Sequence, residues 1–91
     1  MSEPHEVRMK RLAMRSMRRG IKEMDLILSA YADRNLPKMD AAALDLYEAL
    51  LEEHDQDLYR WITGQTAVPD HLQVLISDIK QTLSQIKVTP V

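Results

Sequence analysis

Residues 18–25 read RRGIKEMD and decide where the first long helical segment of this chain is divided. Gly20 stands among strong helix formers, although a glycine inside a helix costs about 1 kcal/mol relative to alanine. Two explanations are compatible with this glycine. The backbone turns there between two helices, or the missing side chain lets another surface come close while Arg19 and Glu23 offer opposite charges beside it.

Apolar residues recur at helical spacing on both sides of this stretch, and strand-like alternation is missing from the sequence. Pro4 suits the first turn of an opening helix, which is predicted to end near residues 17–18. A second helix is predicted to stop near Asn35, because Pro37 disfavours helical geometry in the residues before it. Gly20 then marks the bend or restart between the two.

Three further helices are predicted from their boundary residues. Asp40 is a good amino-terminal cap for a helix that runs to about Glu53. Asp55 is expected to cap a short fourth helix, and Gly64 is well placed to end it. The last helix is predicted to begin near Pro69 or Asp70 and carries the most regular apolar stripe in the chain.

The expected architecture is all-α, a compact bundle of about five short helices. A chain of 91 residues forms one domain at most. We therefore predict a single helical domain over residues 1–91, with its core at about 5–86 and a flexible carboxyl-terminal tail at 87–91.

The composition excludes several classes of protein. The chain has no cysteine, so disulfides and thiolate metal sites are excluded. No apolar run reaches the roughly 18 residues of a membrane span, and charges occupy the positions where a signal peptide needs its apolar region. A soluble, intracellular protein is expected.

Charge is distributed unevenly along the chain. The first 22 residues hold seven of the twelve Lys and Arg but only two of the fourteen acidic residues, which leaves about +5 there and about −7 in the rest. This polarity favours oriented docking onto a charged partner. On a helical projection, six cations share about one third of the circumference: Arg8, Arg11, Arg15, Arg18, Arg19 and Lys22.

Two segments carry a resemblance to a known family. They are Arg19-Gly20-x-x-Glu23 and, further along, Asp55-x-Asp57-Leu58-Tyr59-x-Trp61-Ile62. In this order and at this separation, they resemble the small flavinylation factors of succinate dehydrogenase, which are also called succinate dehydrogenase assembly factors. The resemblance covers about residues 8–79.

The resemblance implies a non-enzymatic assembly factor. Such a factor would bind the flavoprotein subunit of succinate dehydrogenase, or that of the related fumarate reductase, and promote covalent attachment of FAD to it. With two glycines the chain has no phosphate-wrapping loop, so it is not expected to hold FAD stably by itself. The residues expected to meet the partner are Arg19, Gly20, Glu23, Arg18, Arg15, Arg11, Arg8 and Asp25.

Other interpretations stay open at this point. The basic amino-terminal helix could belong to a small regulatory or nucleic-acid-binding module, although the chain as a whole is slightly acidic. Arg19 and Glu23 could form a simple exposed ion pair worth about 0.3 to 0.5 kcal/mol. Asp25 could extend the docking patch or serve only the helix end. The acidic residues at 52–57 are more simply explained by helix ends than by a metal site.

Location and oligomeric state are expectations as well. The family-like region starts close to the first residue, which favours a bacterial cytoplasm over a mitochondrial matrix. No membrane insertion is expected, and the free protein is predicted to be a monomer.

Overall fold

The computed structural model describes residues 3–86, and within this range it contains helices and no strand. The predicted all-α bundle of about five short helices is confirmed. The predicted flexible tail lies outside the described residues. The elements are α1 (His5–Met17), α2 (Lys22–Asn35), the 3-10 turn η1 (Leu36–Lys38), α3 (Ala41–Leu51), α4 (Asp55–Ile62), the 3-10 turn η2 (Asp70–Leu72) and α5 (Gln73–Ile86).

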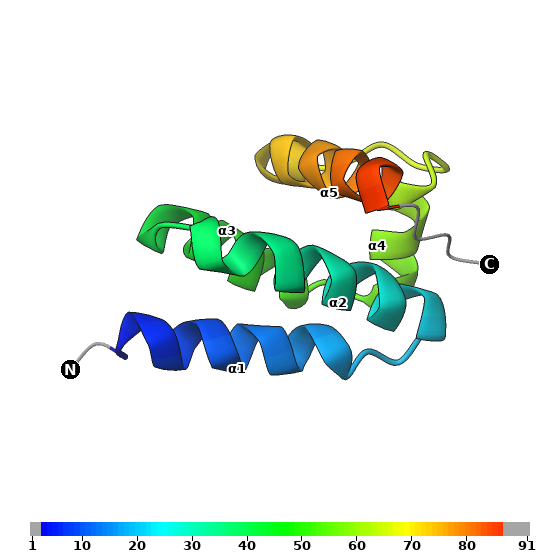
Figure 1. Ribbon diagram of the computed structural model, residues 1–91. Coiled ribbons are helices and arrows are strands. Elements are labelled where there is room, and N and C mark those ends of the chain that lie inside the picture. Colours follow the sequence, from blue (N-terminus) through cyan, green and yellow to red (C-terminus); the bar gives the residue numbers. More distant parts are fainter. Residues whose placement is uncertain (1–2, 87–91) are drawn as a thin grey trace.

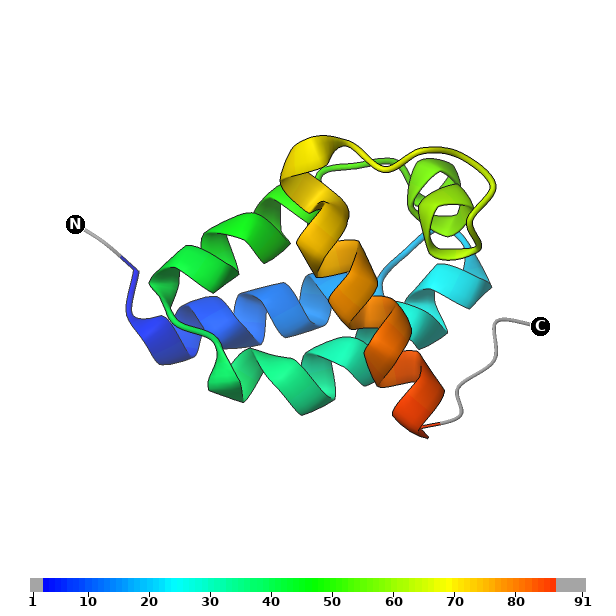
Figure 2. The same cartoon turned by 90° about the horizontal axis from the view of Figure 1, so that it is seen from above.

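The helices are stacked in layers. Figure 1 shows α1 along one side of the bundle, α2 and α3 in the middle, and α5 on the opposite side. α1 packs on α2 and α3, whereas α5 packs on α2 and α4. Seen from above in Figure 2, α5 crosses the helices beneath it obliquely. α1 therefore has one side in the bundle and one side directed away from it.

Two of the predicted helix boundaries have the expected local chemistry. The Asp40 side chain accepts a hydrogen bond from the backbone N–H three residues on, at 2.9 Å, and so caps α3. Gly64 has a φ of 78° after the end of α4. There its N–H donates to the carbonyl of Trp61, and the N–H of Gln65 donates to that of Arg60. This pair of bonds is the Schellman motif that ends many helices.

The expectation that Asp55 caps α4 is wrong. The capping position is occupied by His54, and no side chain there bonds to the first turn of the helix. Asp55 is instead the first residue inside α4, and its carboxylate bonds to the segment between α1 and α2. Asp55 therefore stabilises a distant loop and not the first turn of its own helix.

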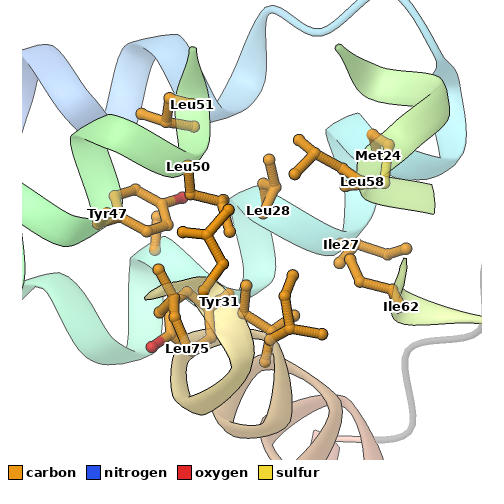
Figure 3. Close-up of a cluster of buried hydrophobic side chains, with 14 of the residues drawn as sticks. Met24, Ile27, Leu28, Tyr31, Tyr47, Leu50, Leu51, Leu58, Ile62 and Leu75 are labelled. Atoms are coloured by element: carbon orange, nitrogen blue, oxygen red, sulfur yellow. The ribbon is translucent and has the colours of Figure 1, made fainter. Parts of the chain in front are cut away.

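Buried side chains from all five helices form one core. Figure 3 shows members of this core from α2, α3, α4 and α5. Tyr31 and Tyr47 are its largest fully buried members, with ring centroids 5.8 Å apart. The Tyr31 hydroxyl donates to Asp78 at 2.6 Å, and the Tyr47 hydroxyl bonds to that of Ser16 at 2.5 Å. Burial raises the pKa of Tyr47 to about 12. Both phenols therefore pack as apolar rings while their polar ends keep a partner.

Candidate functional site

The segment at residues 18–21, here called the 18–21 loop, joins α1 to α2 and is held by one carboxylate. Asp55 accepts a hydrogen bond from Arg19 Nε at 2.5 Å. It also accepts the backbone N–H groups of Gly20 at 2.6 Å and Ile21 at 3.2 Å. N–H groups at the start of a helix have no partner inside the helix. Asp55 supplies one for the chain as it enters α2.

The guanidinium group of Arg19 binds backbone carbonyls at and just after the carboxyl end of α3. Its Nη1 donates to the carbonyl of Leu51 and its Nη2 to the carbonyl of Glu53, each at 2.9 Å. Carbonyls at a helix carboxyl end lack internal partners, and a cation is favourable there. The side chains of Arg19 and Asp55 are only 10% and 13% exposed. Arg19 therefore joins the 18–21 loop to the end of α3 and the start of α4.

The alternative in which Arg19 pairs with Glu23 is wrong for this structure. That pair requires a continuous helix, whereas α1 ends at Met17 and α2 begins at Lys22. The ion pair of Arg19 is with Asp55. The turn explanation for the glycine is confirmed, because Gly20 lies in the loop between two helices.

Gly20 is exposed, and the described structure leaves room for a side chain at this position. Its φ lies outside the left-handed range, unlike that of Gly64. A Cβ added to it would meet the nearest atom, Oδ2 of Asp55, at 3.4 Å, which is the lower edge of ordinary contact. Gly20 therefore presents bare backbone on a loop whose position is fixed by Asp55.

The remaining predicted residues near the loop differ in their surroundings. Glu23 is half-buried in the first turn of α2, and residues 3–86 provide it with no ion pair. Asp25 accepts a hydrogen bond from the Ser29 hydroxyl at 3.3 Å, within its own helix, and its contact with a partner stays a prediction. Arg18 is exposed at the end of α1. Gly20, Glu23 and Arg18 thus lie at one junction, around the short connection between two helices.

The three other predicted arginines face α3. Each pairs with an acidic side chain of that helix or of the residue directly after it: Arg8 with Asp45 at 2.6 Å, Arg11 with Glu48 at 2.9 Å, and Arg15 with Glu52 at 3.1 Å. We call these six residues the α1–α3 ladder. The ladder attaches α1 to the rest of the bundle, beside the few buried side chains that α1 contributes. A partner-binding role for its arginines stays a prediction.

Glu48 is the central acid of the ladder, and its replacement by glutamine gives a testable effect. Hydrogen bonds from Arg11 and Arg8 lower the pKa of Glu48 below its usual value of 4.5. Its stabilising contribution is therefore present above that value and is lost as the pH falls through the lowered pKa. We expect Glu48→Gln to lower the Tm by about 3 °C in dilute buffer, and by less in about 1 M salt.

Thermal unfolding followed by circular dichroism at the two salt concentrations measures this effect. A drop in Tm of the same size at both concentrations would contradict an electrostatic origin, because exposed ion pairs are screened by salt.

Sequence reasoning missed Asp55 as the partner of Arg19, and it missed the acids of the ladder. One signal for the ladder was present. The three arginines are separated by three and then four residues, and Asp45, Glu48 and Glu52 are separated in the same way. Two helices that pack side by side can match such stripes residue for residue. For Asp55, the sequence carries no comparable signal.

Two further properties concern the described residues only. Within residues 3–86, no helix is both long enough and apolar enough to cross a bilayer. The same range contains no cluster of three or more acidic, His or Cys side chains placed to hold a metal ion.

Comparison with known proteins places the chain in a family. The family model described as "Flavinator of succinate dehydrogenase" matches residues 10–83, so the chain belongs to this family. Similar proteins are named "Succinate dehydrogenase assembly factor 2, mitochondrial". The one from Schizosaccharomyces japonicus is 41% identical over 76 residues, which are 81% of this chain and 53% of that protein. The one from Saccharomyces cerevisiae is 44% identical over 62 residues, which are 68% and 38%.

The chain spans about half the length of these relatives, or less. The resemblance to succinate dehydrogenase assembly factors is confirmed. The expected location, a bacterial cytoplasm, is contradicted because the relatives are named as mitochondrial proteins. That expectation depended on where the family-like region starts in this chain, and such a position carries no physical information about the compartment.

Proposed function

We propose that this chain binds the flavoprotein subunit of succinate dehydrogenase, and that of the related fumarate reductase, and promotes covalent attachment of FAD to it. The chain itself is not the catalyst in this proposal. Membership of the flavinator family supports the proposal. The observation that carries it is the exposed Gly20, held by Asp55 in a fixed loop beside Glu23.

The geometry of the loop suits docking onto another polypeptide. Exposed backbone without a side chain allows close approach, and Glu23 offers a carboxylate that residues 3–86 leave without an ion pair. The Arg19–Asp55 pair holds the loop in one conformation before binding. Less conformational entropy is therefore lost when the partner binds. FAD is attached within the partner, so this chain would act by holding the immature subunit in the arrangement that aligns its own reacting groups.

The test is co-expression of the flavoprotein subunit with and without this chain. Covalent flavin remains with the polypeptide in a denaturing gel, where its fluorescence is measured. The proposal expects much higher fluorescence per subunit in the presence of the chain. Equal fluorescence, reached equally fast without it, would show that the proposed function is wrong.

Glu23→Gln gives a residue-level prediction in the same assay. We expect covalent flavin to fall by roughly threefold or more, because a charge at the contact surface is lost. Circular dichroism and urea unfolding should be unchanged, since the described residues provide Glu23 with no ion pair. Glu6→Gln is the matched control, because Glu6 is also in the first turn of a helix but is far along the chain from the 18–21 loop. Full flavin attachment with Glu23→Gln would remove Glu23 from the contact surface.

A further inference from the structure

The side of α1 directed away from the bundle carries a shallow hollow of about 630 Å³. α1 lies at one edge of the molecule in Figure 1, so this side is not covered by another helix there. Seven residues of α1 and the 18–21 loop line the hollow. Two of them, Val7 and Met14, are apolar, and the other five are Lys or Arg. We call this hollow the α1 groove; acidic side chains are missing from its lining.

Exposed apolar side chains gather along this groove. Val7 and Met14 are 51% and 52% exposed, and Met17, one turn further on, is 58% exposed. Residues seven apart on a helix lie on the same side, two turns from each other. Large apolar side chains this exposed are uncommon in the described part of the chain, and three of the five belong to α1. Methionine adapts to irregular surfaces, so it is suited to contact with another protein.

The positive charge of the groove has two sources. Three of the lining cations are arginines whose guanidinium groups are already paired within the fold. These pairs are Arg11 with Glu48, Arg15 with Glu52 and Arg19 with Asp55. Lys10 and Arg18 are exposed, and the described residues give them no ion pair. A partner that places carboxylates opposite these two cations would form ion pairs with them.

We propose that the α1 groove binds an amphipathic segment of the flavoprotein subunit, one that carries carboxylates beside apolar side chains. This inference depends on the proposed function and names a second contact surface for it. In this arrangement apolar side chains of the partner cover Val7 and Met14, while its carboxylates face Lys10 and Arg18. Arg18 lines the groove and is also the first residue of the 18–21 loop, so the groove and the Gly20 surface form one continuous interface in this proposal.

Charge and composition favour this occupant over nucleic acid. Phosphates would satisfy the cations but leave the exposed Val7 and Met14 without a role, and the lining offers no aromatic ring on which a base could stack. An acidic amphipathic segment uses both kinds of side chain. The partner is therefore a protein surface in this proposal, and binding to DNA is a contrary outcome of the test.

The experiment measures binding of the purified chain to the purified flavoprotein subunit by fluorescence anisotropy at several salt concentrations. We expect Met14→Glu to weaken binding by about tenfold or more, because it places an anion among apolar contacts. Lys10→Glu should weaken binding by about threefold or more and reduce its salt dependence. The matched controls are Val74→Glu and Lys80→Glu on α5, which are exposed and should change binding by less than about twofold.

The outcomes separate this inference from the proposed function. If Gly20→Arg stops binding while Met14→Glu and Lys10→Glu bind as well as the unmodified chain, the groove is not a contact surface and the proposed function stands. If the unmodified chain does not bind the subunit at all, both proposals are overturned. A generic DNA duplex that binds more tightly than the subunit, and that is released by Lys10→Glu, would show that the proposed occupant is wrong.

Discussion

Replacing Asp55 by alanine is expected to lower the free energy of unfolding by about 3 kcal/mol, the typical cost of removing one member of a largely buried ion pair. The Asp55 carboxylate accepts from Arg19, Gly20 and Ile21. Without it, the Arg19 guanidinium keeps only two carbonyl partners in a position that is 10% exposed. A domain of this size has a total free energy of unfolding of roughly 5 to 14 kcal/mol, so the loss is large but leaves the protein folded.

Urea unfolding followed by circular dichroism measures this change, and Asp57→Ala is its matched control. Asp57 lies on the same helix, two residues further on, and pairs with Arg60 at 3.6 Å on the exposed surface. Such a pair contributes less than about 0.5 kcal/mol. If the two variants lost similar stability, Asp55 would not be the attachment point of the 18–21 loop.

The second large effect is expected for Gly20→Arg, which should reduce binding to the proposed partner, the flavoprotein subunit, by about a hundredfold or more. Gly20 is exposed, and its φ is accessible to other residues. An arginine there can extend into solvent, so the free protein should keep its helical circular dichroism. Its bulk would occupy the space into which the partner must approach. Co-purification with the subunit, followed by a direct affinity measurement, tests this expectation.

Two other glycine variants give the controls. Gly20→Ala adds a Cβ that meets Asp55 at 3.4 Å, so a stable protein with intermediate binding is expected. Gly64→Ala should lose about 1 kcal/mol of stability, because alanine is strained at a φ of 78°, yet it should bind the partner normally. Normal complex formation by Gly20→Arg would contradict the assignment of this loop as the docking surface.

The helices of this fold were predictable because their signals are local. Asp40 and Gly64 define helix ends through bonds to residues close in sequence, and the structure contains both. The regular apolar stripe of the last helix likewise predicts its buried face, on which Ile76 and Ile79 are almost fully buried. Short-range chemistry of this kind depends little on how the elements pack together.

The partners of the charged residues were not predictable in the same way. A run of arginines is compatible with solvent, with a partner or with an acidic helix elsewhere in the chain, and only packing decides among these. Asp55 illustrates the difficulty, because an aspartate at the start of a helix suggests a cap while its real contacts are about 35 residues away in sequence. The sequence therefore predicted the turn at Gly20, which the structure contains, whereas the contacts that hold this loop came from the structure. The partner-binding role of the loop stays a prediction.

The Arg19–Asp55 contact has a consequence for how variants of this protein are interpreted. Arg19 lies in one of the two segments on which the family resemblance was based, so the effect of replacing it would naturally be attributed to failed binding of the proposed partner. In the structure, the Arg19 side chain also stabilises the fold, because it joins the 18–21 loop to the end of α3 and the start of α4. An assay that measures only the covalent flavin of the partner gives the same result for a misfolded variant and for a folded variant that does not bind. Thermal unfolding of the purified variant distinguishes the two cases.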